Sequence, residues 1–99
     1  MRQVQWSDAA LDDLEKQAVH IAKEDPAAAM RIAGRIRKTG NRLGEFATGH
    51  PGRVNGTYEQ SVRGLPWIIA YARSEDDRVL TIVRVIHTSR NWLSEEWPE

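Results

Sequence analysis

A histidine near the end of the sequence lies between two arginines, in the run RVIHTSRNW. His87 follows Arg84 by three residues and precedes Arg90 by three. A histidine can act as a general acid or base near neutral pH, and an arginine can stabilise the negative charge that develops on a reacting phosphate. These residue types could therefore cleave RNA, provided that their side chains converge on one phosphate.

The geometry of an extended strand argues against that convergence. The apolar residues around the histidine predict a β-strand, in which successive side chains point to opposite faces. Arg84 and His87 then point apart, unless a bulge or a sharp twist redirects one of them. We favour a histidine that ends a core strand and hydrogen-bonds to the backbone, and we keep the catalytic hypothesis as the alternative.

A second polar row lies earlier in the sequence. Glu59, Ser61 and Arg63 alternate with less polar residues and share one face of an expected strand. A carboxylate, a hydroxyl and a guanidinium in one row could bind or cleave RNA. Such a row is more often solvated cross-strand pairing, in which each pair contributes roughly 0.2–1 kcal/mol.

The formal charge of the chain is zero, but the charged residues are unevenly distributed. Residues 8–25 carry six acids and two lysines, net −4, whereas residues 31–63 carry seven bases and two acids, net +5. The basic stretch could face an acidic partner, although two helices whose solvated faces attract each other would give the same pattern. The zero net charge and the presence of only three lysines argue against a protein that depends on gripping nucleic acid.

Composition also excludes other kinds of site. The sequence has no cysteine, so disulfides and thiolate sites are excluded, and its three histidines are too scattered to predict a metal site. We expect no metal and no cofactor. Neither a signal peptide nor a membrane-spanning run of roughly 20 apolar residues is recognisable, which predicts a cytoplasmic protein. Trp92 and Trp97 near the end either anchor a protein partner or fold back over a sheet edge.

Periodicity predicts one domain over residues 1–99 with the order β-αα-βββ. The first residues alternate as a short strand, and Ser7 and Asp25 are suited to cap two amphipathic helices that a tight turn joins into a hairpin. Glycines and prolines in residues 44–57 predict a loop, and the three apolar runs after it predict strands joined by hairpin turns. This is an α+β fold, in which a helical hairpin packs on one face of a small, mostly antiparallel sheet.

Three stretches, taken in order, carry a family resemblance. VQWSDAALDDLEKQAVHIAKEDPAAAMRIAGRI is similar to a family opening of the form W-[ST]-x-x-A-x-x-D-L followed by N/D-P-x-A-A. HPGRVNGTYEQSV is similar to G-R-x-x-x-G-[TV]-x-E, and LPWIIAYARSEDDRVLTIVRVIHTSRNW to an ending with I-x-R-V-x-H-x-x-R-x-W. Over nearly its whole length the chain resembles the RelE/ParE superfamily, the toxins of type II toxin–antitoxin systems.

The resemblance implies the β-αα-βββ fold and one of two activities. ParE-like members inhibit DNA gyrase and need no catalytic residues, whereas RelE-like members cut mRNA on the ribosome. The stretch GRVNGTYE is more similar to ParE-like members, which implies a gyrase inhibitor. The alternative, a ribosome-dependent mRNA endonuclease, would use Arg63 or Arg84 to stabilise the phosphate and His87 to move protons.

The resemblance also implies a protein partner. A cognate antitoxin would bind across the sheet and the grooves of the helical hairpin, through a segment that we expect to be acidic. The candidates for binding this antitoxin or the target are Arg31, Arg35, Arg53, Tyr58, Arg90, Trp92 and Trp97.

Overall fold

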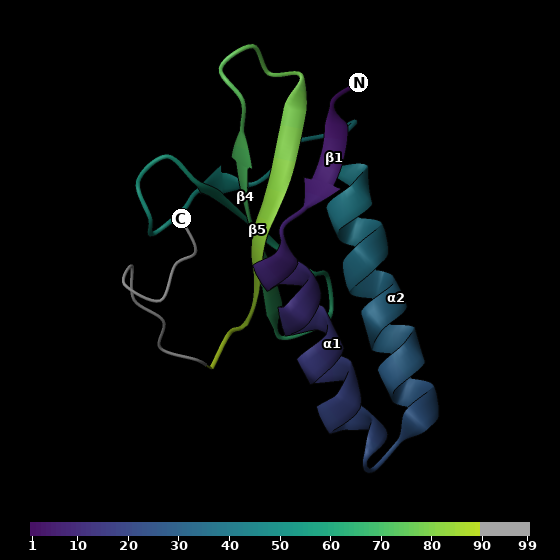
Figure 1. The fold of residues 1–99 in the computed structure, drawn as a ribbon. Helices are drawn as coiled ribbons and strands as arrows, with labels where there is room; N and C mark the ends of the chain where they lie inside the picture. Colours follow the sequence, from purple (N-terminus) through teal and green to yellow (C-terminus); the bar gives the residue numbers. More distant parts are fainter. Residues whose placement is uncertain (90–99) are drawn as a thin grey trace.

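The computed structural model of the protein describes residues 1–89 (Figure 1). Two helices form a hairpin that packs along one face of a twisted five-stranded sheet. The predicted α+β class and the order of the elements are confirmed, with one addition, because the expected loop contains a strand of two residues. The elements are β1 (Gln3–Trp6), α1 (Asp8–Ala22), α2 (Pro26–Arg42), β2 (His50–Pro51), β3 (Tyr58–Ser61), β4 (Trp67–Arg73) and β5 (Val79–His87).

The sheet brings the first strand beside the last. Its strand order is β1-β5-β4-β3-β2. β1 runs parallel to β5, with Gln3 opposite Val79, and the other neighbours are antiparallel. The added strand β2 lies at the opposite edge, where His50 pairs with Glu59. A proline is tolerated in such a strand because one side of an edge strand needs no ladder hydrogen bond.

Local sequence signals fix the beginnings of both helices. The Ser7 hydroxyl accepts the backbone N–H of Ala10, and the Asp25 carboxylate accepts that of Ala28, each at 3.0 Å. These are the N-cap bonds that the sequence predicts. Pro26 occupies the first turn of α2, where its missing N–H costs nothing. Within residues 1–89 no helix is long and apolar enough to span a bilayer.

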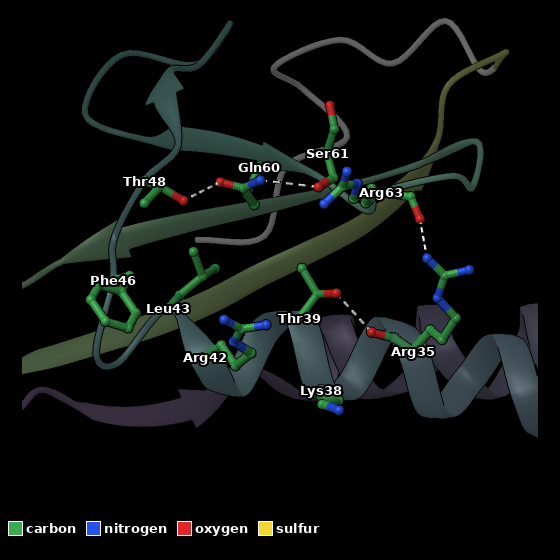
Figure 2. Close-up of a pocket in the computed structure, with 10 residues that line it drawn as sticks. All are labelled: Arg35, Lys38, Thr39, Arg42, Leu43, Phe46, Thr48, Gln60, Ser61 and Arg63. Carbon is green, nitrogen blue, oxygen red and sulfur yellow. Dashed lines mark hydrogen bonds between the residues drawn. The ribbon is translucent and has the colours of Figure 1, made fainter.

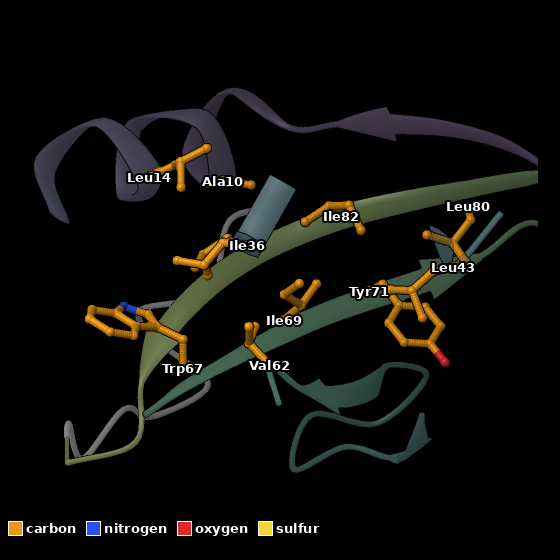
Figure 3. Packing of buried hydrophobic residues seen from close by; sticks show 11 residues of the cluster. Ala10, Leu14, Ile36, Leu43, Val62, Trp67, Ile69, Tyr71, Leu80 and Ile82 are labelled. Carbon is orange, nitrogen blue, oxygen red and sulfur yellow. The ribbon is translucent and has the colours of Figure 1, made fainter. Parts of the chain in front are cut away.

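The main core lies between the helical hairpin and the sheet (Figure 3). Ile36 of α2 packs there with Ile69 and Tyr71 of β4, and all three are fully buried. The Tyr71 hydroxyl accepts the backbone N–H of Gly49 at 2.9 Å, and burial raises the pKa of this phenol. A smaller cluster around Ala70 occupies the other face of the sheet. The core therefore fixes β4 and β5 as the rigid centre from which the polar residues project.

An indole joins the first strand to the second helix. Trp6 Nε1 donates to the Asn41 side-chain oxygen at 3.0 Å, and the ring lies against Gly40 of α2. A Cβ atom at Gly40 would stand only 2.6 Å from the ring. Glycine at this position therefore allows α2 to approach β1 closely.

Candidate functional site

A β-bulge in β5 interrupts the regular strand that the apolar pattern predicts. Ala70 of β4 lies opposite Arg84, but the next residue, Tyr71, lies opposite Ile82. Val83 is thus an extra residue without a partner of its own. The bulge comes before Arg84, and the pairing from Arg84 onwards is regular. Strand alternation consequently applies to the residues of the candidate site.

Arg84 and His87 project from opposite faces of the sheet. Arg84 pairs with Ala70, which belongs to the smaller cluster, and His87 pairs with Trp67, which belongs to the main core on the helical side. Residues three apart on a strand point to opposite sides. The prediction that these two side chains diverge is confirmed, and the bulge does not bring them together.

Arg84 forms an ion pair with α1. Its Nε and Nη2 atoms donate to the two carboxylate oxygens of Asp13 at 2.7 and 2.9 Å, and the Val85 backbone N–H donates to the same carboxylate at 3.0 Å. The side chains of Arg84 and Asp13 are only 18% and 11% exposed. A bidentate pair of this kind neutralises the guanidinium, so moving Arg84 to a phosphate would break a partly buried ion pair.

His87 lies at a separate place, at the end of β5. Its ring meets the Trp67 indole edge to face, with 4.9 Å between ring centroids. Its Nδ1 accepts the Ser89 backbone N–H at 3.1 Å and lies 2.7 Å from the Ser89 hydroxyl oxygen. With Gln17 and His20 of α1 it lines a pocket of about 440 Å³. This arrangement matches the strand-end histidine bonded to backbone that we favoured.

Arg63 lines a surface hollow in the described part of the chain. This hollow, about 520 Å³, lies between α2 on one side and β3 with the loop before it on the other (Figure 2). Four of the residues that line it are cations, and none of the described lining residues is an acid. We call it the basic groove, and its lining residues are Arg35, Lys38, Thr39, Arg42, Leu43, Phe46, Thr48, Gln60, Ser61 and Arg63.

Hydrogen bonds hold the two walls of the basic groove in place. The Arg35 guanidinium donates to the backbone carbonyl of Arg63 and so links α2 to the turn after β3. On the sheet side, the Thr48 hydroxyl lies 2.8 Å from the Gln60 side-chain oxygen. Phe46, at one end of the groove, is 60% exposed. The basic groove thus combines fixed positive charge with an uncovered aromatic ring.

The other candidate residues are dispersed. Arg31 is exposed on α2 outside the basic groove, and the backbone N–H of Arg53 donates to the buried Glu59 carboxylate at 2.8 Å. Tyr58 stacks on Tyr71 with 5.6 Å between ring centroids, and the Arg73 guanidinium covers its ring. Three further candidates lie outside the described residues, namely Arg90, Trp92 and Trp97.

The polar row of β3 is only partly solvated. Glu59 is 5% exposed and holds the loop before β3, whereas Ser61 and Arg63 are exposed and belong to the basic groove. Sequence reasoning did not single out Lys38, which joins Arg63 in this groove. A signal for it was present, because Arg35, Lys38 and Arg42 follow one another at intervals of three and four residues and must share a helix face.

A model of the family described as the ParE toxin of type II toxin–antitoxin system, parDE, matches residues 4–92. The chain belongs to the ParE toxin family. It is therefore the toxin of a type II toxin–antitoxin system. A Sinorhizobium fredii protein named "Putative toxin Y4kP" is 36% identical over 92 residues, which cover 92% of this chain and 93% of that protein.

Solved structures share the fold of this ParE-family toxin. A chain of the chromosomal ParDE toxin–antitoxin system from P. aeruginosa gives a TM-score of 0.80 at 20% identity, covering 88% of this toxin and 96% of that chain. A chain of the toxin–antitoxin complex RelBE2 from Mycobacterium tuberculosis gives 0.61 at 22% identity, covering 87% and 96%. At these identities the likeness concerns the fold, and it agrees with the RelE/ParE resemblance of the sequence.

Proposed function

We propose that this ParE-family toxin acts by binding DNA gyrase and blocking it, without catalysing a reaction of its own. The observation that carries the proposal is the bidentate pair between Arg84 and Asp13. This pair uses one of the two arginines that flank His87 in the sequence motif for a contact within the fold. A toxin without a reactive centre must act through the surfaces that it presents to a protein target.

The placement of the other candidate catalytic residues supports the same proposal. Arg63 lies in the basic groove, His87 lies against Trp67, and Arg84 lies against α1. General acid–base catalysis at a phosphate needs its groups within hydrogen-bonding reach of one substrate. The zero net charge of the chain also gives little long-range attraction for a ribosome or an mRNA.

Expression of the toxin in cells, followed by pulse labelling, tests the proposal. We expect incorporation of a DNA precursor to fall first, while incorporation of amino acids continues. His87→Gln removes the only imidazole of the RVIHTSR motif and should inhibit growth as strongly as the wild type. A fall in protein synthesis first, with cleaved mRNA that His87→Gln abolishes, would favour the RelE-like nuclease instead.

We also propose that a cognate antitoxin binds this toxin in the cytoplasm and neutralises it. The support comes from the solved structures with the same fold, which are named as a ParDE system and a RelBE2 toxin–antitoxin complex. We expect the protein encoded by the adjacent gene to restore growth when co-expressed and to purify with the toxin. Continued growth inhibition in its presence would contradict this assignment.

A further inference from the structure

We propose that Asn55 is a site of spontaneous deamidation, a covalent modification in which water is the only co-reactant. Asparagine is among the chemically labile residues of proteins. The Asn55–Gly56 pair lies in the loop between β2 and β3, outside the basic groove and the His87 pocket. The proposal concerns the chemical fate of the toxin rather than its target, so it does not depend on the proposed block of gyrase.

Asn55 and Gly56 are the two central residues of a tight turn. The Thr57 backbone N–H donates to the Val54 carbonyl at 3.1 Å, and the Thr57 hydroxyl donates to the same oxygen at 2.6 Å. Gly56 has a backbone φ of 86°, a conformation that the third residue of a type II turn adopts and that glycine favours. The two residues therefore stand at the tip of the turn, and both are exposed.

The two groups that would react are unprotected in the described part of the chain. The Asn55 side-chain amide makes no hydrogen bond with any of the residues 1–89, and neither does the backbone N–H of Gly56. A Cβ atom at Gly56 would meet no other atom within 4 Å, so the space around this peptide is open. Rotation of the Asn55 backbone can thus bring the Gly56 nitrogen to the Asn55 side chain without displacing a packed neighbour.

The reaction conserves atoms and needs no oxidant or reductant. The Gly56 backbone nitrogen attacks the Asn55 Cγ atom, the bond from Cγ to Nδ2 breaks, and the side-chain nitrogen leaves as ammonia with the proton from the Gly56 nitrogen. The product is a cyclic imide, a succinimide. Water then opens the ring at Cγ to give aspartate, or at the main-chain carbonyl carbon to give isoaspartate, in which the main chain runs through the former side chain.

Deamidation changes both the charge and the backbone of a turn that supports the sheet. Both products add a carboxylate close in sequence to the buried Glu59, whose own carboxylate accepts the Arg53 backbone N–H at 2.8 Å. Isoaspartate also adds a methylene group to the main chain between Val54 and Thr57, and so alters the hydrogen bond that closes the turn. Val54 packs against the smaller cluster of the sheet, so we expect isoaspartate to destabilise the fold more than aspartate does.

Asn41 provides a control within the same molecule. It lies in α2, and its side-chain oxygen accepts the Trp6 Nε1 proton at 3.0 Å. The next residue is Arg42, whose backbone N–H belongs to the hydrogen-bonded ladder of the helix. Deamidation at Asn41 consequently requires local opening of α2, whereas deamidation at Asn55 requires no opening of a helix or strand.

Tryptic peptide mapping of the full-length toxin, after incubation at mildly alkaline pH, tests the proposal. Cleavage after lysine and arginine places Asn55 in peptide 54–63 and Asn41 in peptide 39–42, each without a second asparagine. We expect the conversion of amide to acid in peptide 54–63 to be at least about 10-fold faster than in peptide 39–42, because α2 must open first. Asn55→Gln, whose longer side chain closes a ring less readily, should show no conversion at this position.

A synthetic peptide 54–63 serves as the reference for an unprotected Asn55–Gly56 pair. An Asn55 that stays an amide in the folded toxin, while this peptide is converted under the same conditions, would overturn the proposal. Equal rates at Asn55 and Asn41 would overturn it as well, because the reaction would then follow unfolding of the chain.

The effect on the fold is measured separately. The isoaspartyl form, purified by ion exchange, should have a lower Tm than the Asn55→Asp variant, which carries the new charge without the longer main chain. Equal Tm values would contradict the structural effect assigned to the turn.

Discussion

Asp13 carries more of the stability of the fold than its place on a helix surface suggests. Its carboxylate accepts two bonds from Arg84 and one from the Val85 backbone, so it ties α1 to β5 just after the bulge. Removal leaves a partly buried guanidinium and a backbone N–H without this acceptor. We predict that Asp13→Ala lowers the free energy of unfolding by about 2–4 kcal/mol in urea titrations.

The neighbouring acid provides the control for this prediction. Asp12 pairs with Lys16 at 2.9 Å, but both side chains are largely exposed. Asp12→Ala should therefore change the free energy of unfolding by less than about 0.5 kcal/mol. Equal effects of the two substitutions would mean that the Arg84–Asp13 pair does not stabilise the fold, and the argument that Arg84 is unavailable for catalysis would fail.

The ion pair between Arg2 and Asp77 makes the stability of the fold sensitive to acid. Arg2 donates two hydrogen bonds to its carboxylate, at 2.7 and 2.6 Å, and these hold the pKa of Asp77 below its ordinary value. A lowered folded-state pKa contributes stability above the unfolded-state pKa, and this contribution is lost as the pH falls through the folded-state pKa. Asp77→Asn should thus lower Tm at neutral pH, with a difference from the wild type that shrinks in acid.

The choice of asparagine isolates the charge. Asp77 has a backbone φ of 58°, and asparagine tolerates this left-handed conformation about as well as aspartate does. Glu75→Gln, in the same turn, is the control, because Glu75 is exposed and its side chain makes no hydrogen bond or ion pair with any of the residues 1–89. A Tm difference for Asp77→Asn that stays constant with pH would contradict the role given to the Arg2 bridge.

Helix α2 has one glycine that is tightly packed against another element, Gly40, and one that faces open space, Gly34. A Cβ atom at Gly40 would lie 2.6 and 2.8 Å from two atoms of the Trp6 ring, whereas one at Gly34 would meet nothing within 4 Å. We predict that Gly40→Ala destabilises the protein by about 1–3 kcal/mol through overpacking. Gly34→Ala should stabilise it by about 0.5–1 kcal/mol, because alanine favours helix. Thermal unfolding of both variants measures this contrast, and a stabilising Gly40→Ala would refute the close approach of α2 to β1.

How far the sequence predicts each element depends on how local its determinants are. The helices were predictable from Ser7 and Asp25, because an N-cap acts within one turn. The bulge at Val83 was not, since it depends on how β5 pairs with β4 and meets α1. Likewise, Arg84 and Asp13 are 71 residues apart in sequence, and no local pattern joins them.

The candidate site shows the same limit. Strand alternation was sufficient to predict that Arg84 and His87 point apart. The basic stretch fitted either an acidic partner or two helices whose solvated faces attract each other. The basic groove itself was not predictable, because its walls come from α2, from the loop that carries Phe46 and from the strand that carries Gln60. The periodicity of a sequence shows which face of each helix or strand is apolar, but it does not show which of these faces pack against one another.

At the scale of the whole molecule, charge and architecture favour a protein that works by binding. The polar residues that could have formed one reactive centre are distributed over an ion pair, a histidine pocket and the basic groove. The net charge is zero, so a protein target suits this surface better than RNA does. The ParE family membership agrees with that distribution.

A gyrase supercoiling assay with purified toxin tests this account most directly. We predict that wild-type toxin and His87→Gln inhibit supercoiling with the same dependence on concentration, and that neither cuts mRNA in a translating extract. Normal supercoiling at saturating toxin, together with mRNA cleavage that requires His87, would contradict the proposal that this toxin blocks gyrase.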